Sequence, residues 1–184
     1  AVQASLTGHL VFSTLHTNSA ASSITRLIDI GVEPFLVSST LNIIVAQRLV
    51  RTICSDCKEP IKVTPAIWEM VQKYLSFLFQ TTSQKEEVLN AYPIIPENLS
   101  EDTLQIYRGR GCNMCLDSGF RGRVGIFEVL ELTDSIKDLV VKKSSDRDLE
   151  KAAIKEGMIT LIQEGMLKVL DGLTTIEEVL RVAA

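Results

Sequence analysis

Two cysteine pairs constrain the fold of this chain more than any other sequence feature. Cys54 and Cys57 form one C-x-x-C pair, Cys112 and Cys115 form the other, and the chain contains no further cysteine. A C-x-x-C turn brings two sulfur atoms to one side of the backbone, so two such turns can supply four thiolates to one tetrahedral ion. We therefore expect these residues to bind a structural metal ion, with zinc favoured, and the long segment between the pairs to form an insert.

Other roles for the cysteines remain open on the sequence alone. Two disulfides or four buried thiols are alternatives, but a secreted disulfide scaffold is usually smaller and richer in cysteine. The first residues show no secretory signal peptide. A thioredoxin-like redox pair opens a helix after a strand, and neither pair has that context. Because no histidine lies near either pair, we expect a closed site without catalytic activity.

Composition limits the class of protein. The chain has 184 residues, of which 46% are hydrophobic and 5% aromatic, so one or two domains with an aliphatic core are expected. No apolar run approaches the roughly 20 residues that cross a bilayer. The formal net charge of −4 argues against a general nucleic-acid-binding protein, which normally carries a basic surplus. The first residues have the pattern of the middle of a secondary-structure element. We therefore expect this chain to be a piece of a longer protein.

Residues 9–16 have the pattern of a buried strand that becomes polar at its end. Thr17, Asn18 and Ser19 then offer N-cap side chains for a helix that continues to about residue 30. Strand, polar turn and helix form the repeating unit of an open α/β sheet, in which ligands bind at the carboxyl ends of the strands. His16 lies at such an end. Two satisfied polar histidines, at the two ends of the strand, are the alternative interpretation.

The rest of the sequence predicts elements around the cysteine pairs. Pro34 suits the first turn of a helix that continues to about residue 46, and a strand at 48–53 leads into the first pair. The insert contains an amphipathic helix at 68–79 and several aromatic residues, which form either its own core or a docking surface for a partner. Shorter elements are predicted as a helix at 86–91 and strands at 104–107 and 122–130.

Several arginines precede or follow the cysteine pairs. Those near the second pair are expected to offset the negative charge of a metal–thiolate unit or to pair with carboxylates. Those on the 48–53 strand are expected to be solvated charges, with contact to a nucleotide or a neighbouring subunit as the alternative. The residues concerned are Arg48, Arg51, Arg108, Arg110, Arg121 and Arg123.

Helical patterns fill the sequence from Thr133 onward. Ser145 is predicted to cap one helix, and Thr175 to cap the last one, with Glu178 in the capping-box position. The carboxylates of this region are expected on solvent-facing sides of the helices. No catalytic constellation is predicted there.

Residues 7–18 read Thr-Gly-His-Leu-Val-Phe-Ser-Thr-Leu-His-Thr-Asn, and they are the first of several sequence blocks in a fixed order. This block resembles the histidine box of the secretion ATPases that drive type II secretion and type IV pilus assembly. The subgroup with a tetracysteine module, comprising secretion and pilus extension ATPases, fits better than the retraction motors, which lack that insert. Further similar blocks lie at 31–35, 46–51, 119–126 and 172–179.

The resemblance implies an α/β fold: the C-terminal part of a RecA-like P-loop NTPase core, an inserted tetracysteine zinc module and a small α-helical C-terminal cap. It implies that His9 and His16 lie near the γ-phosphate of ATP, with Thr14 in a weaker phosphate-sensing role. It also implies a Mg²⁺-dependent homo-hexamer that is cytoplasmic, peripheral to the inner membrane and bound to a membrane platform protein and other assembly proteins. The expected division is 1–53 for the core, 54–118 for the metal module, 119–132 for a return strand and 133–184 for the helical subdomain.

One departure from the family pattern affects the expected activity. The sequence contains no G-x-x-x-x-G-K-[ST] motif, and no acidic strand end suited to Mg²⁺ precedes the histidine box. We therefore expect ATP hydrolysis by a longer protein and not by this chain alone. The rival hypothesis is a non-enzymatic, zinc-stabilised binding module that docks to a membrane platform or adaptor protein.

Overall fold

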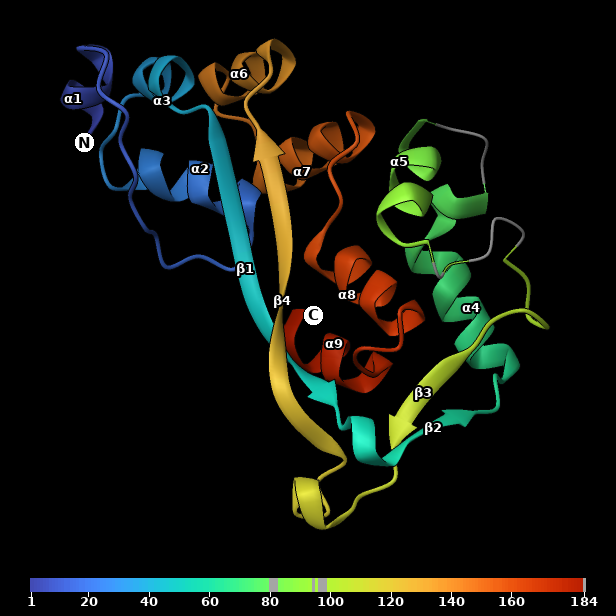
Figure 1. The fold of residues 1–184 in the computed structure, drawn as a ribbon. Helices are drawn as coiled ribbons and strands as arrows, with labels where there is room; N and C mark the ends of the chain where they lie inside the picture. The colour runs from blue at the N-terminus through green and yellow to red at the C-terminus, as the bar shows by residue number, and fades with distance from the viewer. Residues whose placement is uncertain (80–82, 94, 96–98, 184) are drawn as a thin grey trace. The chain divides into compact units, whose positions relative to one another are not determined.

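The computed structural model describes residues 1–79, 83–93, 95 and 99–183, and it shows a mixed α/β protein (Figure 1). The chain divides into two compact units. Unit 1 comprises Ala1–Gln47 and Phe127–Thr160, and unit 2 comprises Arg48–Ile126 and Leu161–Ala184. The helices predicted at 133–184 fall in both units. The predicted functional division at residues 54, 119 and 133 stays a prediction.

Two long strands contribute residues to both units. Strand β1 (Ile43–Ile53) pairs with strand β4 (Phe120–Glu131), and Figure 1 shows that they run in opposite directions. The end of β1 leads directly into Cys54, and β4 begins shortly after Cys115. The predicted strands at 48–53 and 122–130 are therefore confirmed, and both are longer than expected.

Unit 1 has an aliphatic core between its helices. Its helices are α1 (Val2–Leu6), α2 (Ala20–Asp29), α3 (Pro34–Thr40), α6 (Asp134–Val141) and α7 (Asp146–Lys155). Ile24 of α2, Val37 of α3, Ile136 of α6 and Leu149 of α7 are each at most 2% exposed and belong to one cluster. Burying such side chains is the main favourable term in folding, so this cluster accounts for the packing of the short helices.

Hydroxyl side chains begin these helices. Ser19 and Ser22 form a capping box at α2, in which Ser19 Oγ accepts a hydrogen bond from the Ser22 N–H at 3.2 Å and Ser22 Oγ accepts one from the Ser19 N–H at 3.1 Å. Ser145 caps α7 by accepting a hydrogen bond from the Asp148 N–H at 3.3 Å. Each cap satisfies backbone donors that a helix leaves without partners in its first turn. The predicted cap at Ser145 is confirmed, and of the three cap candidates Thr17, Asn18 and Ser19 the structure uses Ser19.

The predicted strand at 9–16 is wrong. These residues form an irregular segment between α1 and α2, and all of their side chains are exposed. Leu10 and Phe12 are 81% and 87% exposed. Among the described residues, β1 and β4 pair with each other and β2 pairs with β3, so no strand is left to pair with this segment. A local apolar pattern predicts a strand only where a neighbouring strand can satisfy its backbone groups.

The helix that begins at Pro34 ends at Thr40, not near residue 46. Its C-cap residue, Leu41, has extended dihedral angles of φ −91° and ψ 127°. The β-branched residues Ile43, Ile44 and Val45 follow and start β1. Such residues pack well in strands and lose rotamer freedom in helices, which explains the early helix end.

Unit 2 contains a second pair of strands, which extend from the cysteine turns. Strand β2 (Lys58–Ile61) pairs antiparallel with β3 (Ile106–Gly109), with Lys58 opposite Gly109 and Ile61 opposite Ile106. The register places the ends of the strands near Cys57 and Cys112 next to each other. This ladder brings two cysteine pairs that are distant in sequence to one place.

The insert packs against α8 (Leu161–Leu170), which also contacts α9 (Ile176–Ala183). Tyr92 Oη lies 2.9 and 3.0 Å from the two Glu164 carboxylate oxygens, so its single O–H donates to that carboxylate, and Lys168 Nζ lies 3.1 Å from the same carboxylate. The insert consists of α4 (Pro65–Tyr74), a 3-10 turn (Ser76–Phe79) and α5 (Ser83–Ala91). The predicted helix at 68–79 thus begins and ends earlier, with Thr64 as its N-cap and Pro65 in its first turn. No helix among the described residues is long and apolar enough to cross a bilayer.

Candidate metal centre and histidine segment

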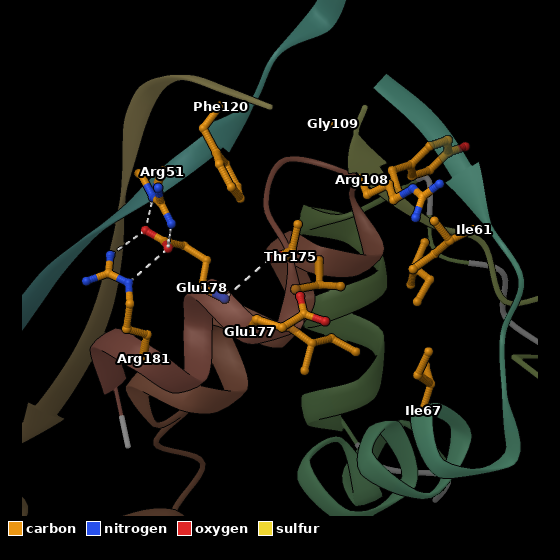
Figure 2. A pocket seen from close by; sticks show the side chains of 14 residues that line it. Arg51, Ile61, Ile67, Arg108, Gly109, Phe120, Thr175, Glu177, Glu178 and Arg181 are labelled. Atoms are coloured by element: carbon orange, nitrogen blue, oxygen red, sulfur yellow. Dashed lines mark hydrogen bonds and ion pairs between the residues drawn. The ribbon is translucent and has the colours of Figure 1, made fainter. Parts of the chain in front are cut away.

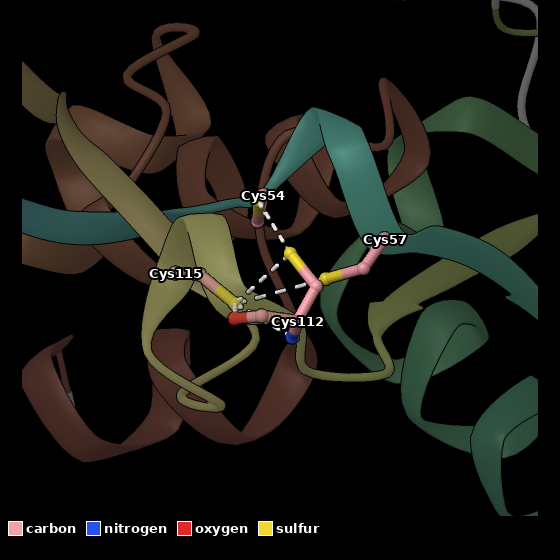
Figure 3. Close-up of side chains that lie close together, drawn as sticks. All are labelled: Cys54, Cys57, Cys112 and Cys115. Atoms are coloured by element: carbon pink, nitrogen blue, oxygen red, sulfur yellow. Dashed lines mark hydrogen bonds between the residues drawn. The ribbon is translucent and has the colours of Figure 1, made fainter.

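The four cysteines meet in one cluster in unit 2. Cys54 precedes a 3-10 turn (Ser55–Cys57) that ends at Cys57, and Cys112 precedes a second 3-10 turn (Asn113–Cys115) that ends at Cys115 (Figure 3). All four sulfur atoms lie within 4.8 Å of one another. Three of the cysteines are buried, and Cys112 is half-buried. The sequence prediction that the two pairs converge is confirmed.

The sulfur separations fit a tetrahedral metal site. The Sγ–Sγ distances are 4.0 Å for Cys54–Cys112, 3.8 Å for Cys57–Cys115 and 3.7 Å for Cys112–Cys115. A disulfide requires about 2.05 Å, and all four cysteines are free. Zinc–sulfur bonds of about 2.3 Å place the corners of a regular tetrahedron about 3.8 Å apart. These cysteines are therefore arranged as ligands of one ion, and the chemistry of the donor set suits a soft cation such as zinc.

A pair of glycines allows the second turn to approach the first. A Cβ atom on Gly119 would lie 2.6 Å from the carbonyl oxygen of Gly109, and Gly119 has a φ of +75°. The Gly119 carbonyl accepts a hydrogen bond from the Cys54 N–H at 3.0 Å, and its N–H donates one to Cys115 Sγ at 3.3 Å. Gly119 thus joins both cysteine turns through backbone atoms alone.

The protein environment acts differently on the individual thiols. Burial raises the pKa of Cys54 and raises that of Cys57 to about 12. Burial also acts to raise the pKa of Cys115, but hydrogen bonds from the Cys112 and Gly119 N–H groups outweigh it and lower that pKa to about 7. Metal ions bind cysteine as the thiolate. The positive charge of a bound cation would therefore stabilise the thiolate form of the buried sulfurs, which burial alone disfavours.

Carboxylates near the cluster pair with two of the four arginines that lie near the second cysteine pair. Arg108 of β3 lies 2.8 Å from Glu59 of β2, and Arg121 lies 3.5 Å from Asp56 in the first turn. Both pairs are substantially exposed, so each contributes little to stability. The expectation that these arginines pair with carboxylates is confirmed for Arg108 and Arg121.

The candidate phosphate-contacting residues lie on the irregular segment of unit 1. His9, Thr14 and His16 are all exposed, and His9 Nδ1 lies 3.0 Å from Thr7 Oγ1. The structure does not enclose these side chains in a formed site, so their phosphate role stays a prediction.

The turn after His16 is held firmly by side chains of unit 1. Thr17 Oγ1 lies 2.7 Å from Ser23 Oγ, and Ser23 Oγ also donates to the Ser19 carbonyl at 3.2 Å. The Ala20 N–H, at the first position of α2, donates a 2.8 Å hydrogen bond to Glu128 Oε1 of β4. The sequence did not predict a role for Glu128. The alternation of Ile126, Glu128 and Leu130 at inward positions of a strand was the available signal.

A cavity of about 500 Å³ in unit 2 has a charged cluster on one wall (Figure 2). Glu178 of α9 is 2% exposed and lies 2.7 Å from Arg51 of β1 and 2.6 Å from Arg181 of α9. The prediction that the carboxylates of the C-terminal helices face solvent is therefore wrong for Glu178. Arg51 is also an ion-pair partner and not only a solvated strand-edge charge. Its guanidinium lies 4.2 Å from the centroid of the Phe120 ring, an added cation–π contact.

The sequence as a whole matches one protein family. A family model described as "Type II/IV secretion system protein" matches residues 1–181. The chain belongs to this family, whose fold implies a P-loop NTPase part.

Individual relatives are similar over nearly the whole chain. It is 43% identical over 182 residues to the type II secretion system protein E of Pseudomonas aeruginosa, covering 99% of the chain and 31% of that protein. It is 43% identical over 182 residues to the type II secretion system ATPase E of Vibrio cholerae, with the same coverage. It is 40% identical over 178 residues to the type IV pilus assembly ATPase PilB of Myxococcus xanthus, covering 97% of the chain and 28% of that protein. The chain thus spans less than a third of the length of these relatives.

Proposed function

We propose that the chain is the C-terminal part of a hexameric ATPase that powers assembly of a type IV pilus or a type II secretion pseudopilus. The identity of 40–43% to secretion and pilus ATPases over nearly the whole chain carries this proposal. The rest of a RecA-like core supplies the phosphate-binding loop and the Mg²⁺ site. The complete protein works at the cytoplasmic face of the inner membrane against a membrane platform protein.

Within that enzyme we assign His9 and His16 to the γ-phosphate of ATP, with Thr14 as a weaker contact. The exposure of all three side chains in this chain supports the assignment, because it leaves them open to a ligand or to another part of the protein. Imidazole N–H donors aimed at phosphate oxygens stabilise the charge that develops during phosphoryl transfer.

The cysteine cluster has a structural role in this proposal, with zinc as its metal. Four thiolates at tetrahedral separations leave no open coordination position for a substrate. The ion fixes the end of β1, the start of β4 and the paired strands β2 and β3 to one another. It therefore shapes the motor without taking part in hydrolysis.

Steady-state ATP hydrolysis by the full-length protein tests the proposal. His16→Ala is expected to lower kcat by about 100-fold, a typical loss for removal of one donor to a transferring group. Ser13→Ala, at an exposed position of the same segment, is the matched control and is expected to keep wild-type turnover. Unchanged kcat in the His16→Ala protein would remove the phosphate role. Nucleotide-independent binding to a membrane platform protein, without any ATPase activity of the full-length protein, would instead support the non-enzymatic alternative.

A further inference from the structure

We propose that Glu128 is a positioning residue for His16: its buried carboxylate fixes the start of α2 and so sets where the chain places the histidine. The inference rests on the phosphate role proposed above for His16. Glu128 lies on β4, more than a hundred positions along the chain from the histidine segment. Its carboxylate accepts a hydrogen bond from the N–H of Ala20, the residue at which α2 begins after that segment.

A carboxylate is an unusual side chain at a buried, inward-facing position of a strand, and Glu128 occupies such a position. Along β4 the inward positions are Ile126, Glu128 and Leu130, and the two aliphatic residues are fully buried while Glu128 is 3% exposed. An apolar residue there would extend the core without the desolvation cost of a carboxylate. Placing a charged group at such a position departs from the binary pattern of the strand, and departures of this kind concentrate at functional sites.

The contact made by Glu128 suits a carboxylate. Its Oε1 accepts the Ala20 N–H at 2.8 Å, and Ala20 is fully buried. Ala20 is the first residue of α2, where the helix dipole favours a negative charge. The carboxylate therefore anchors α2 to β4 at the helix end that follows the histidine segment.

The link from Ala20 to His16 is short, and hydrogen bonds hold it at Thr17 and Ser19. Only Thr17, Asn18 and Ser19 separate His16 from Ala20. Thr17 is hydrogen-bonded to Ser23 at 2.7 Å, and Ser19 takes part in the capping box with Ser22. The backbone after His16 therefore has little freedom, and displacement of Ala20 moves the histidine.

Simple stabilisation of α2 does not require this arrangement. The capping box of Ser19 and Ser22 already satisfies donors at the helix start. What Glu128 adds is a connection between that helix start and a strand. Positioning errors of about 1 Å near a reacting group lower rates by about 100-fold, so a lost anchor is expected to act on kcat.

The test uses the full-length ATPase and compares Glu128→Ala, Glu128→Gln and Leu149→Ala. Leu149 is 1% exposed in the same core and its aliphatic side chain makes no hydrogen bond to Ala20, so its truncation is the control for lost stability. At a temperature below all unfolding transitions, Glu128→Ala is expected to lower kcat at least about tenfold with KM for ATP within about twofold. Glu128→Gln, which keeps the acceptor, is expected to restore most of kcat, and Leu149→Ala is expected to keep it.

A double variant distinguishes positioning of His16 by Glu128 from an effect of Glu128 on kcat that is independent of His16. If Glu128 acts through His16, the His16→Ala/Glu128→Ala protein should be no slower than His16→Ala alone. Wild-type kcat in Glu128→Ala, equal losses in Glu128→Ala and Leu149→Ala, or additive losses in the double variant would each overturn the inference while the His16 role stands. Full turnover in the His16→Ala single variant would refute the proposed phosphate role, and the inference about Glu128 with it.

Discussion

Arg51 of β1 and Glu178 of α9 form an ion pair of 2.7 Å that joins the C-terminal helix to the strand leading into the metal cluster. Glu178 also accepts the Arg51 backbone N–H at 3.0 Å. The loop before α9 adds two contacts: the Thr174 hydroxyl donates to the Arg51 carbonyl at 2.8 Å, and the Ile53 N–H donates to the Leu173 carbonyl at 2.8 Å. The position of Cys54 therefore depends on residues near the C-terminus.

Loss of the Glu178 carboxylate should destabilise unit 2. Glu178→Ala removes an acceptor that Arg51 and Arg181 share, and hydrogen bonds to buried charged groups contribute about 1–3 kcal/mol. The two guanidinium groups are 45% and 59% exposed and remain solvated in the variant, which keeps the effect within this range and below that of a fully buried pair. Urea unfolding measures the change. Glu177→Ala, at the exposed neighbouring position, is the control and should unfold like the wild type.

The same carboxylate predicts a pH dependence. Hydrogen bonds from Arg181 and then Arg51 hold the pKa of Glu178 well below its unfolded value of 4.5. A carboxyl with a depressed folded-state pKa contributes its full stabilisation above the unfolded pKa, and this contribution is lost as the pH falls toward the folded pKa. The stability difference between wild type and Glu178→Gln should therefore be constant above about pH 5 and shrink below pH 4.5. A difference that grows on acidification would contradict the assignment. Glu156→Gln is the comparison variant. Hydrogen bonds from Ser135 and Thr133 also lower the pKa of the exposed Glu156 carboxyl, so its stability difference from wild type should shrink on acidification in the same direction.

Removal of one thiol should release the metal. Cys57→Ser leaves three thiolates, and structural zinc sites derive several kcal/mol of folding free energy from a complete ligand set. Freshly purified, reduced wild-type protein is expected to contain one equivalent of zinc by elemental analysis, and the variant much less, with a lower unfolding midpoint. Ser55→Ala, in the same turn, should keep the metal. Wild-type protein without stoichiometric metal would refute the structural role.

The close approach of Gly109 and Gly119 gives a prediction with a matched control. Gly119→Ala places a Cβ atom 2.6 Å from a backbone oxygen, which cannot move cheaply, and should separate the two cysteine turns and weaken metal binding. Gly122→Ala shares the unfavourable backbone conformation, with φ of +89° against +75°, but its Cβ would meet nothing within 4 Å. Both variants lose about 1 kcal/mol from the left-handed backbone. Competition with a chromogenic chelator should show a weaker metal affinity for Gly119→Ala alone, and equal affinities would refute the steric argument.

The sequence predicted those parts of the structure that depend on local signals. The two C-x-x-C pairs and the helix caps at Ser19 and Ser145 are short patterns whose chemistry is complete within a few residues. Features that depend on distant residues were missed. The pattern at 9–16 cannot show whether a neighbouring strand exists, and the burial of Glu178 is set by Arg51, 127 positions away. Glu128 was missed for the same reason, since its partner is 108 positions away.

Attachment of the insert to α8 should depend on the hydroxyl of Tyr92. Burial, together with the adjacent Glu164, raises the pKa of Tyr92, so the hydroxyl stays protonated and remains a donor. Tyr92→Phe removes the hydroxyl that donates to Glu164 and leaves Lys168 as the charged partner of this half-buried carboxylate. We expect faster limited proteolysis and faster amide exchange within residues 62–103, with a loss of about 1 kcal/mol in stability. Tyr74→Phe removes a hydroxyl from a half-buried tyrosine of the same insert and should change neither measurement. Equal protection of the insert in both variants would show that apolar packing, and not the Tyr92–Glu164 contact, holds the insert on α8.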